Sequence, residues 1–243
     1  MNAKSGPLMA TVAALAVSAS AQDLVSSDLN FQSGGKRIGV LAFRPKSAQR
    51  LPAIVVLHGA GGVDASNAYV RQIASTVAAQ GYATYLVEYF DRTGTSYADD
   101  RTIRANADKW LATLDDAVGF VARRPEVDAR RIGVFGYSLG GYLAVAHSSR
   151  DPRVRAVVEL GGGIEPELAR DVRRLPPTLI IHGKEDGRVP FARAVELQAV
   201  LQKLGTHVET VFLAGARHSR SPPAAFQALA RSLEFFRVHL KSE

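Results

Sequence analysis

The pentapeptide Gly136-Tyr137-Ser138-Leu139-Gly140 constrains the fold more than any other feature of this 243-residue chain. The run Arg131–Phe135 before it favours a strand, and Leu139–Ser148 after it favours a helix. So tight a turn from strand to helix forces strained backbone angles on its central residue, and the two glycines prevent clashes between helix and strand. We therefore expect the Ser138 hydroxyl at the N-terminus of the helix, where the helix dipole favours negative charge. A phosphate-binding turn or plain tight packing is the alternative interpretation.

Strand-like and helix-like segments alternate on both sides of this turn. The β-branched run Ala53–Leu57 is typical of a strand buried on both faces, and Ser66–Gln80 and Asp99–Arg124 place apolar residues at helical spacing. Further strands are expected over residues 36–43, 82–89, 154–160, 177–181 and 208–213, and further helices from residue 190 to before 205 and over 224–240. This alternation predicts an α/β fold, with a mostly parallel twisted sheet of about seven to eight strands and helices on both faces.

A serine hydroxyl needs a base to become a nucleophile, and His218 is the histidine that we expect to serve it. It lies in the segment Ala214–Ser219, between the last predicted strand and the last predicted helix. A loop at the carboxyl edge of the sheet can reach over the serine, whereas His58 and His182, which follow strands directly, cannot. A histidine with a purely structural role is the alternative interpretation of His218.

Asp186 is the predicted partner of that histidine. It follows the strand over 177–181 by a short turn and precedes Pro190, so its carboxylate can accept a hydrogen bond from the imidazole and hold the productive tautomer. Glu185 is adjacent but would point to the other side of the turn, and Glu159, at the end of the preceding strand, is the fallback acid. An aspartate that only caps the following helix is the alternative interpretation.

The serine, the aspartate and the histidine occur in the chain order of the α/β-hydrolase design, which differs from the orders of the two common serine protease designs. An early buried strand leads into Val56–Gly62, where this design has its oxyanion loop. We expect the amides of Ala60 and Leu139 to converge on a carbonyl oxygen as it becomes an oxyanion. Losing one such donor typically costs about 3 kcal/mol of transition-state stabilisation.

Taken together, these motifs resemble the α/β-hydrolase superfamily and, within it, the dienelactone hydrolase family. The resemblance covers nearly the whole chain from about residue 28 and rests on V-L-H-G-A-G-G, Y-F-D-R-T-G, F-G-Y-S-L-G-G, I-I-H-G-K-E-D-G-R-V-P and G-A-R-H-S. Dienelactone hydrolases proper carry cysteine as the nucleophile, whereas position 138 here is serine. The resemblance therefore implies a hydrolase of general carboxylic esters, without a large lid, rather than one specific for dienelactone.

Several side chains are candidates for contact with a substrate. Arg92 follows a predicted strand close to the expected cleft, where arginines of the resembling family hold a substrate carboxylate. A surface ion pair with Asp91 or Asp99 is the alternative. Tyr137 is expected to line the pocket or to pack under the serine. The same ambiguity as for Arg92 applies to the two arginines that flank the predicted base, which are Arg217 and Arg220.

The composition argues against several other functions. The absence of cysteine excludes disulfides, thiolate metal sites and a cysteine nucleophile. The 30 Lys and Arg residues, against 23 Asp and Glu, are spread along the chain without a basic tract interleaved with aromatics, so nucleic acid is not an expected partner. No H-E-x-x-H, clustered Asp/His or G-x-G-x-x-G pattern occurs, and we expect neither a metal nor a cofactor.

Residues 1–21 have the features of a cleavable secretory signal peptide. Lys4 precedes the apolar run Pro7–Ala19, and Ala19-Ser20-Ala21 offers small residues at the positions that a signal peptidase recognises. The run is too short, and too rich in Ala and Ser, for stable membrane insertion. We therefore expect an exported protein, periplasmic or secreted, whose residues 22–243 form a single domain. A cytoplasmic protein with an unstructured N-terminus is the alternative.

The leading hypothesis is a metal-free serine hydrolase that cleaves small carboxylic esters or lactones through an acyl-enzyme intermediate. An acyltransferase or a peptidase would use the same constellation and differ only in its pocket and acceptor. A hydrolase-like binding protein that has lost activity is a hypothesis of another class. The complete set of triad residues argues against it, because a binding protein would be free to lose one of them.

Overall fold

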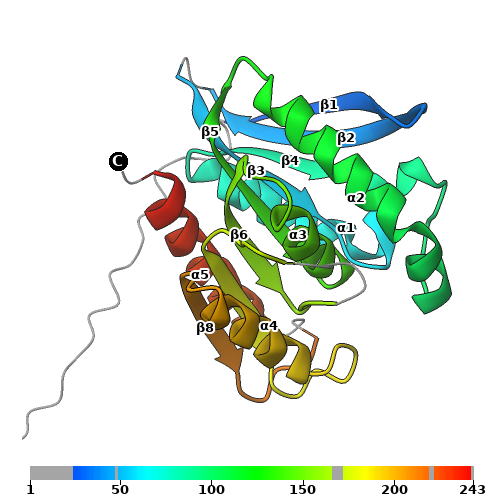
Figure 1. Cartoon of the computed structure of the whole chain (residues 1–243). Helices are drawn as coiled ribbons and strands as arrows, with labels where there is room; N and C mark the ends of the chain where they lie inside the picture. The colour runs from blue at the N-terminus through cyan, green and yellow to red at the C-terminus, as the bar shows by residue number, and fades with distance from the viewer. Residues whose placement is uncertain (1–23, 47–48, 166–171, 219–221, 242–243) are drawn as a thin grey trace, which may run out of the picture.

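A twisted sheet of eight strands lies between two layers of helices in the described part of the chain (Figure 1). The computed structural model describes residues 24–46, 49–165, 172–218 and 222–241, so the predicted signal peptide lies outside the described residues. The strands are β1 (Leu24–Ser33), β2 (Lys36–Pro45), β3 (Leu51–Leu57), β4 (Ala83–Val87), β5 (Val127–Tyr137), β6 (Val154–Leu160), β7 (Thr178–Gly183) and β8 (Val208–Leu213). The helices are α1 (Gly62–Ala79), the 3₁₀ helix η2 (Tyr89–Arg92), α2 (Asp100–Ala122), α3 (Leu139–Ser148), α4 (Ala192–Lys203) and α5 (Pro222–Leu240).

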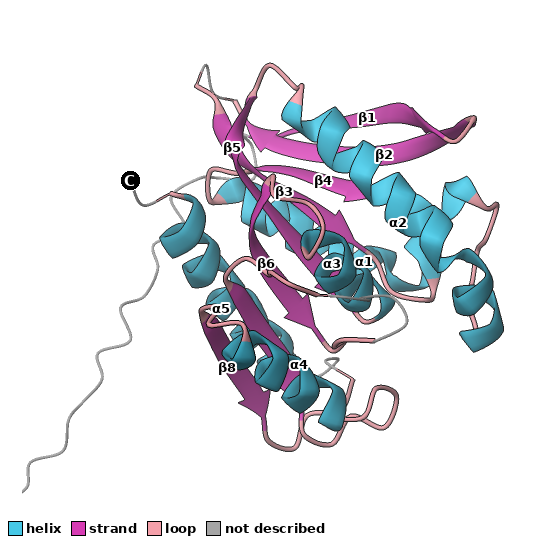
Figure 2. Cartoon of the chain, viewed as in Figure 1, coloured by secondary structure: helices cyan, strands magenta, loops and turns pink. Residues whose placement is uncertain are grey.

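The strands are arranged in the order β1-β2-β4-β3-β5-β6-β7-β8, and the sheet twists from one edge to the other (Figure 2). β2 runs antiparallel to β1 and to β4, whereas every other neighbouring pair is parallel. The prediction of an α/β fold with a mostly parallel sheet is therefore confirmed.

The central strands are apolar along their whole length because helices cover both faces of the sheet. Every residue of β4 and all but the first residue of β3 are buried. α2, α3 and α4 pack on one face through residues such as Trp110, Leu143 and Leu197. α1 and α5 pack on the other through residues such as Val77 and Phe236. Among the helices of the described residues, none is both long and apolar enough to cross a membrane.

β1 is the one strand that the sequence did not indicate. It pairs with β2 along its full length, and Phe31 stacks on Phe120 of α2 with 5.4 Å between the ring centroids. The side chains of β1 alternate between a half-buried and an exposed face over most of its length, as expected at a sheet edge. Its sequence, LVSSDLNFQS, is too polar to give a clear strand pattern on its own.

The parallel strands bring the predicted chemistry to one edge of the sheet, because their carboxyl ends all lie there. β6 and β8 point to the same edge in Figure 1. The residues that follow these carboxyl ends are His58 after β3, Ser138 after β5, Gly161 after β6, Asp186 after β7 and His218 after β8.

Candidate active site

The turn between β5 and α3 holds Ser138 in a strained conformation. Ser138 has φ 55° and ψ −120°, and it is the one non-glycine with positive φ in the part of the chain that the structure describes. Its N–H donates to the Leu160 carbonyl at 2.8 Å, which ties the turn to β6. A Cβ on Gly136 would clash with the Gly140 carbonyl, and a Cβ on Gly140 would lie 2.6 Å from the His58 carbonyl oxygen. Glycine is therefore required on both sides of the serine.

His218 links Ser138 to Asp186 by two hydrogen bonds. Its Nε2 lies 3.0 Å from Ser138 Oγ, and its Nδ1 lies 2.6 Å from Asp186 Oδ2. Because a carboxylate can only accept, Nδ1–H donates to Asp186 and Nε2 is left to accept the serine hydroxyl proton. The three side chains come from the loops after β5, β7 and β8, and together they form one continuous hydrogen-bonded chain.

The loop after β7 fixes the carboxylate of Asp186. Its Oδ1 accepts the N–H groups of Arg188 at 2.8 Å and Val189 at 2.9 Å, which leaves Oδ2 for His218. Burial alone would raise the pKa of Asp186, but these hydrogen bonds outweigh it and leave the pKa lowered. His182 of β7 also holds this loop, because its Nε2–H donates to the Val189 carbonyl at 3.0 Å. Asp186 therefore stays charged and fixed at neutral pH.

Neither of the two other acids considered from the sequence is the partner of His218. Glu185 is exposed to solvent. Glu159 is fully buried beneath the serine turn, where its carboxyl group accepts a hydrogen bond from the N–H of Gly162. Because His218 Nδ1 bonds to Asp186, the fallback assignment of Glu159 as the partner of the histidine does not fit the geometry.

The loop after β3 lies directly against Ser138. A Cβ on Gly59 would lie 3.2 Å from Ser138 Cβ, so backbone and side chain are already in close contact. The N–H of Ala98 donates to the Ala60 carbonyl at 2.9 Å and holds this loop in place. Ala60 and Leu139, the two residues predicted to hold an oxyanion, line the same cavity as the serine.

His58 orders this loop. Its Nδ1–H donates to the Gly59 carbonyl at 2.8 Å, and its ring stacks on Tyr89 with 4.1 Å between the centroids and 7° between the planes. The Tyr89 hydroxyl in turn donates to the His58 carbonyl at 2.8 Å. Burial lowers the pKa of His58 to about 4, even though the hydrogen bond to Gly59 acts in the opposite direction. His58 is therefore neutral at neutral pH and acts as a structural support.

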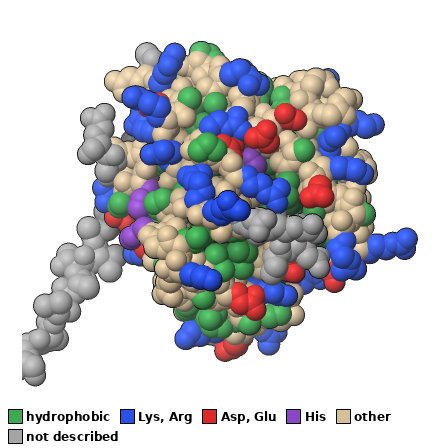
Figure 3. All heavy atoms as spheres, in the orientation of Figure 1, with side chains coloured by type: hydrophobic (Ala, Val, Ile, Leu, Met, Phe, Trp, Pro, Cys, Tyr) green, Lys and Arg blue, Asp and Glu red, His purple; other side chains and the backbone are tan. Residues whose placement is uncertain are grey.

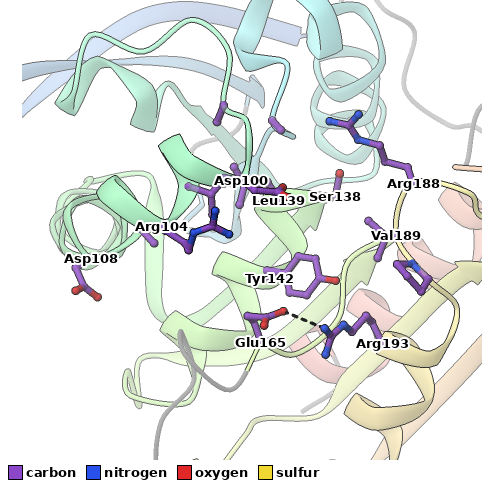
Figure 4. Close-up of a pocket in the computed structure, with 15 residues that line it drawn as sticks. Asp100, Arg104, Asp108, Ser138, Leu139, Tyr142, Glu165, Arg188, Val189 and Arg193 are labelled. Carbon is purple, nitrogen blue, oxygen red and sulfur yellow. Dashed lines mark ion pairs between the residues drawn. The ribbon is translucent and has the colours of Figure 1, made fainter.

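Ser138 opens into a cavity of about 590 Å³ between α2 and the loop that precedes α4. Figure 4 shows Arg104 of α2 and Arg188 of that loop on opposite sides of the serine. Arg193 of α4 forms an ion pair with Glu165 at 3.8 Å on another wall. The apolar wall is formed by Ala60, Ala98, Ile103, Ala107, Leu139, Val189 and Pro190. The cavity thus combines an apolar surface beside the serine with a charged rim.

The groups of side chains that could hold a cation lie outside the wall of this cavity. Figure 3 shows Lys and Arg side chains spread over one face of the molecule, with Asp and Glu side chains among them. Among the described residues, two groups have the side chains and spacing to hold a cation, namely His207 with Glu209 and His239, and Asp115 with His147 and Asp151. Neither group contributes a residue to the wall of the cavity.

The structure does not bring Arg92 to the cavity, so its prediction as a substrate contact is corrected. Its Nη1 donates to the carbonyl of Ser33 at 3.2 Å and also to that of Gly34, in the turn between β1 and β2. The alternative ion pair with Asp91 or Asp99 does not form either. Asp91 accepts the N–H of Gly39, and Asp99 caps α2 by accepting the N–H of Thr102. Arg92 instead ties η2 to the edge of the sheet.

Two of the remaining predicted contacts, Tyr137 and Arg217, also lie outside the cavity wall. Tyr137 is buried beside the serine turn, with its ring 5.6 Å from that of Tyr69 and 5.4 Å from that of His218. Of its two predicted placements, packing is the one observed. Arg217 is exposed and does not line the cavity, and Arg220 lies outside the described residues.

Apart from Ser138, the charged and polar residues of the cavity wall were not predicted from the sequence. Arg104 lies on the exposed side of a long helix, and Tyr142 lies about one turn after Ser138. Arg188 and Arg193 flank Pro190, at the start of α4. The position of Tyr142 gave a usable signal, because one turn of helix brings a side chain back to the same face. The arginines gave no such signal, because their sequence positions do not differ from those of ordinary surface arginines.

Comparison with known proteins identifies the family. The model of the dienelactone hydrolase family matches residues 38–240, which is most of the chain. The chain belongs to the dienelactone hydrolase family. It is accordingly a carboxylic ester hydrolase, a class that includes enzymes acting on lactones.

Individual proteins align with this chain over most of their length. The "Probable 2-oxo-3-(5-oxofuran-2-ylidene)propanoate lactonase" of a Bradyrhizobium species is 26% identical over 239 residues, covering 86% of this chain and 92% of its own. The carboxymethylenebutenolidase of Pseudomonas putida is 27% identical over 227 residues, covering 86% and 93%. The crystal structure of a dienelactone hydrolase-like promiscuous phosphotriesterase from metagenomic libraries has a TM-score of 0.80 at 17% identity, covering 89% and 99%, and shares the fold.

Proposed function

We propose that this protein is a serine hydrolase that cleaves small carboxylic esters or lactones through an acyl-enzyme intermediate. The observation that carries the proposal is the hydrogen-bonded chain from Ser138 Oγ through His218 to Asp186, with contacts of 3.0 and 2.6 Å, at the wall of a cavity. A serine placed in this way can lose its proton to the histidine while it attacks a carbonyl carbon.

The first half of the reaction forms the acyl-enzyme. Ser138 Oγ attacks the carbonyl carbon as its proton passes to His218 Nε2, and Asp186 stabilises the imidazolium that results. The carbonyl oxygen becomes an oxyanion, for which the N–H groups of Ala60 and Leu139 are the proposed donors. When the tetrahedral intermediate collapses, the imidazolium returns the proton to the departing alkoxide, which leaves as an alcohol.

Water completes the reaction. His218 takes a proton from a water molecule, which attacks the acyl carbonyl, and collapse of the second intermediate releases a carboxylic acid and restores the Ser138 hydroxyl. With a lactone, the leaving alcohol stays attached to the acyl group, so the product is a hydroxy acid. The cavity of about 590 Å³ and its apolar wall suit a small acyl group.

A fluorophosphonate probe and a panel of substrates test the proposal. The probe should label Ser138 at neutral pH, because only an activated serine reacts, and Ser138→Ala should remove the labelling. The panel compares p-nitrophenyl esters of increasing acyl length with five- and six-membered lactones. Labelling that persists in Ser138→Ala would refute the nucleophile. An amine or alcohol acceptor that consistently outcompetes water would indicate an acyltransferase instead.

We propose in addition that the protein is exported and loses its first 21 residues. The support is the sequence pattern of Lys4, the apolar run Pro7–Ala19 and the end Ala19-Ser20-Ala21. Mass spectrometry of the protein from its native host tests this. A mature N-terminus at Gln22 is expected, and an intact N-terminus in the cytoplasmic fraction would refute export without affecting the hydrolase proposal.

A further inference from the structure

Glu159 is a buried acid that the proposed reaction does not use. It lies near the end of β6, where its neighbours in the sheet are Gly136 of β5 and Ile180 of β7. Its side chain has no exposed surface. None of the ion pairs found among the described residues includes it, and its Oε2 has no hydrogen-bond partner there. A charged carboxylate in this position would leave a full negative charge unpaired in the protein interior.

The carboxyl group of Glu159 holds the turn after β6 against the serine. Its Oε1 accepts the N–H of Gly162. A Cβ on Gly162 would lie 2.8 Å from the Ser138 carbonyl oxygen and 2.9 Å from Glu159 Oε1, so the turn, the acid and the nucleophile are in close contact. A Cβ on Gly141, in the first turn of α3, would lie 3.2 Å from Glu159 Cγ. Glu159 therefore fills the space between β6 and the segment that positions Ser138.

The surroundings of Glu159 favour its neutral form. Burial raises the pKa of Glu159 to about 8, the hydrogen bond from Gly162 acts in the opposite direction, and the charge of Asp186 raises the pKa further. The titratable groups that face it are Tyr142 of α3 and Asp186 of the loop after β7. Both are acids, so neither supplies a positive charge, and the sheet neighbours Gly136 and Ile180 carry no charge.

A neutral acid here has an advantage over an apolar side chain and over a carboxylate. An apolar side chain would leave the Gly162 N–H without this acceptor, and a buried N–H without a partner is costly. A carboxylate would place an unpaired negative charge beneath the turn that carries Ser138, and such a charge disfavours the oxyanion that forms in the proposed reaction. The protonated acid accepts the hydrogen bond without adding the charge.

We propose that Glu159, in its protonated form, is a positioning residue for the ester hydrolysis proposed above: it fixes the turn at Gly162 against Ser138 and keeps negative charge away from the oxyanion. The inference rests on that proposed function. It assigns Glu159 a role in aligning the nucleophile rather than in contacting the substrate.

Two substitutions distinguish the effect of Glu159 on the alignment of Ser138 from the effect of its charge. Glu159→Gln keeps a carbonyl oxygen for the Gly162 N–H but cannot ionise, whereas Glu159→Ala removes the acceptor. Glu185→Gln, which removes the charge of an exposed acid in the loop that carries Asp186, is the matched control. The kcat and KM for p-nitrophenyl acetate are measured from pH 6 to 10 for wild type and each variant.

The expected results follow from the two parts of the proposal. In wild type, kcat should fall at least about fivefold between pH 7.5 and 9.5 as Glu159 ionises, whereas Glu159→Gln should lose less than about twofold. At pH 7.5, Glu159→Gln should keep kcat within about threefold of wild type, and Glu159→Ala should lose about tenfold or more in kcat with little change in KM. Glu185→Gln should follow wild type throughout.

The melting temperature supplies a readout that does not depend on turnover. The folded state keeps the Glu159 proton up to about pH 8, while the unfolded state, with a pKa of 4.5, releases it earlier. Wild type should therefore lose stability relative to Glu159→Gln as the pH rises from about 4.5 to about 8. This measurement needs only folded wild type and Glu159→Gln, so it holds even if Glu159→Ala does not fold.

Several outcomes overturn the inference. Identical pH profiles of kcat in wild type and Glu159→Gln would refute it while leaving the proposed function intact, as would parallel melting temperatures across the pH range. A change confined to KM would also refute an alignment role. Wild type that neither hydrolyses the ester nor reacts with a fluorophosphonate at Ser138 would instead remove the proposed function, and this inference with it.

Discussion

The Asp186 carboxylate and the His218 imidazole lie 2.6 Å apart, and the loop that carries Asp186 fixes the direction of this contact. One carboxylate oxygen already accepts hydrogen bonds from the N–H groups of Arg188 and Val189. The other accepts from the His218 imidazole, and the buried His182 Nε2 lies 3.6 Å from it. The orientation of the imidazole toward Ser138 is thus decided by backbone hydrogen bonds that form when the loop folds, before any substrate binds. Such preorganisation lowers the reorganisation needed during the reaction.

Asp186→Asn should lower kcat by about 10³- to 10⁴-fold while leaving the fold intact. The amide oxygen can still accept from the backbone, but the amide NH₂ then faces His218 Nδ1 and favours the tautomer that carries its proton on Nε2. That tautomer cannot accept the proton of Ser138. Stopped-flow or steady-state hydrolysis of an activated ester measures the effect, with circular dichroism as the check on folding. Glu185→Gln is the control, and an equal loss in that variant would point to a general disturbance of the loop.

The sequence was sufficient to predict the residues whose position follows from chain topology. Ser138 lies in a local motif whose glycines are required by close backbone contacts, and Asp186 and His218 follow strands whose carboxyl ends must meet. Arg92 also follows a strand, yet its side chain turns toward Gly34. That contact depends on β1, which the sequence did not reveal. Topology fixes where a loop begins, whereas side-chain direction depends on partners far away in the sequence.

Gly136→Ala should destabilise the fold by about 2 kcal/mol or more, because the added methyl group would overlap the Gly140 carbonyl, which belongs to rigid backbone. Urea unfolding at pH 7 measures the loss, and kcat of the folded fraction should fall as well, since the strained turn must shift. Gly187→Ala is the matched control. Its Cβ would meet nothing within 4 Å, so its effect should stay within about 0.5 kcal/mol. Equal stability of the two variants would contradict the close packing at the serine turn.

Acid should destabilise the protein in part through His58. Burial lowers the pKa of His58 to about 4 in the folded state, whereas its ordinary value of 6.5 applies when the chain is unfolded. The unfolded state therefore binds a proton that the folded state does not, and stability falls as the pH drops from about 6.5 to about 4. The full loss is about 3 kcal/mol.

The measurement for His58 is the free energy of unfolding in urea at several pH values between 4 and 7. His58→Gln will have its own cost at neutral pH, so the slope against pH is compared rather than the absolute stability. The slope should become shallower in the variant, although His147, whose pKa burial also lowers to about 4, will keep part of it. An unchanged slope in His58→Gln would show that His58 does not contribute.

Selectivity for charged esters should depend on Arg188 and not on Arg92. The Arg188 guanidinium lines the cavity beside Ser138 and already donates to the Tyr97 hydroxyl at 3.2 Å, so it is held near a bound acyl group. A charge-assisted hydrogen bond to a substrate carboxylate contributes about 1.5–3 kcal/mol, which corresponds to roughly ten- to a hundredfold in kcat/KM. The Arg92 guanidinium is engaged with the carbonyls of Ser33 and Gly34 instead.

The test compares kcat/KM for a matched pair of esters, one with a free carboxylate and one neutral, in wild type, Arg188→Ala and Arg92→Ala. In Arg188→Ala the charged ester should lose at least about tenfold more than the neutral one. In Arg92→Ala both esters should change alike, and the melting temperature should fall because η2 loses its contact with the β1–β2 turn. A preferential loss of the charged ester in Arg92→Ala would mean that its guanidinium leaves that turn and reaches the substrate. Equal losses of kcat/KM for both esters in Arg188→Ala would refute charge recognition by Arg188. They would instead assign Arg188 a role in the stability of the loop, because its N–H is one of the two that fix Asp186.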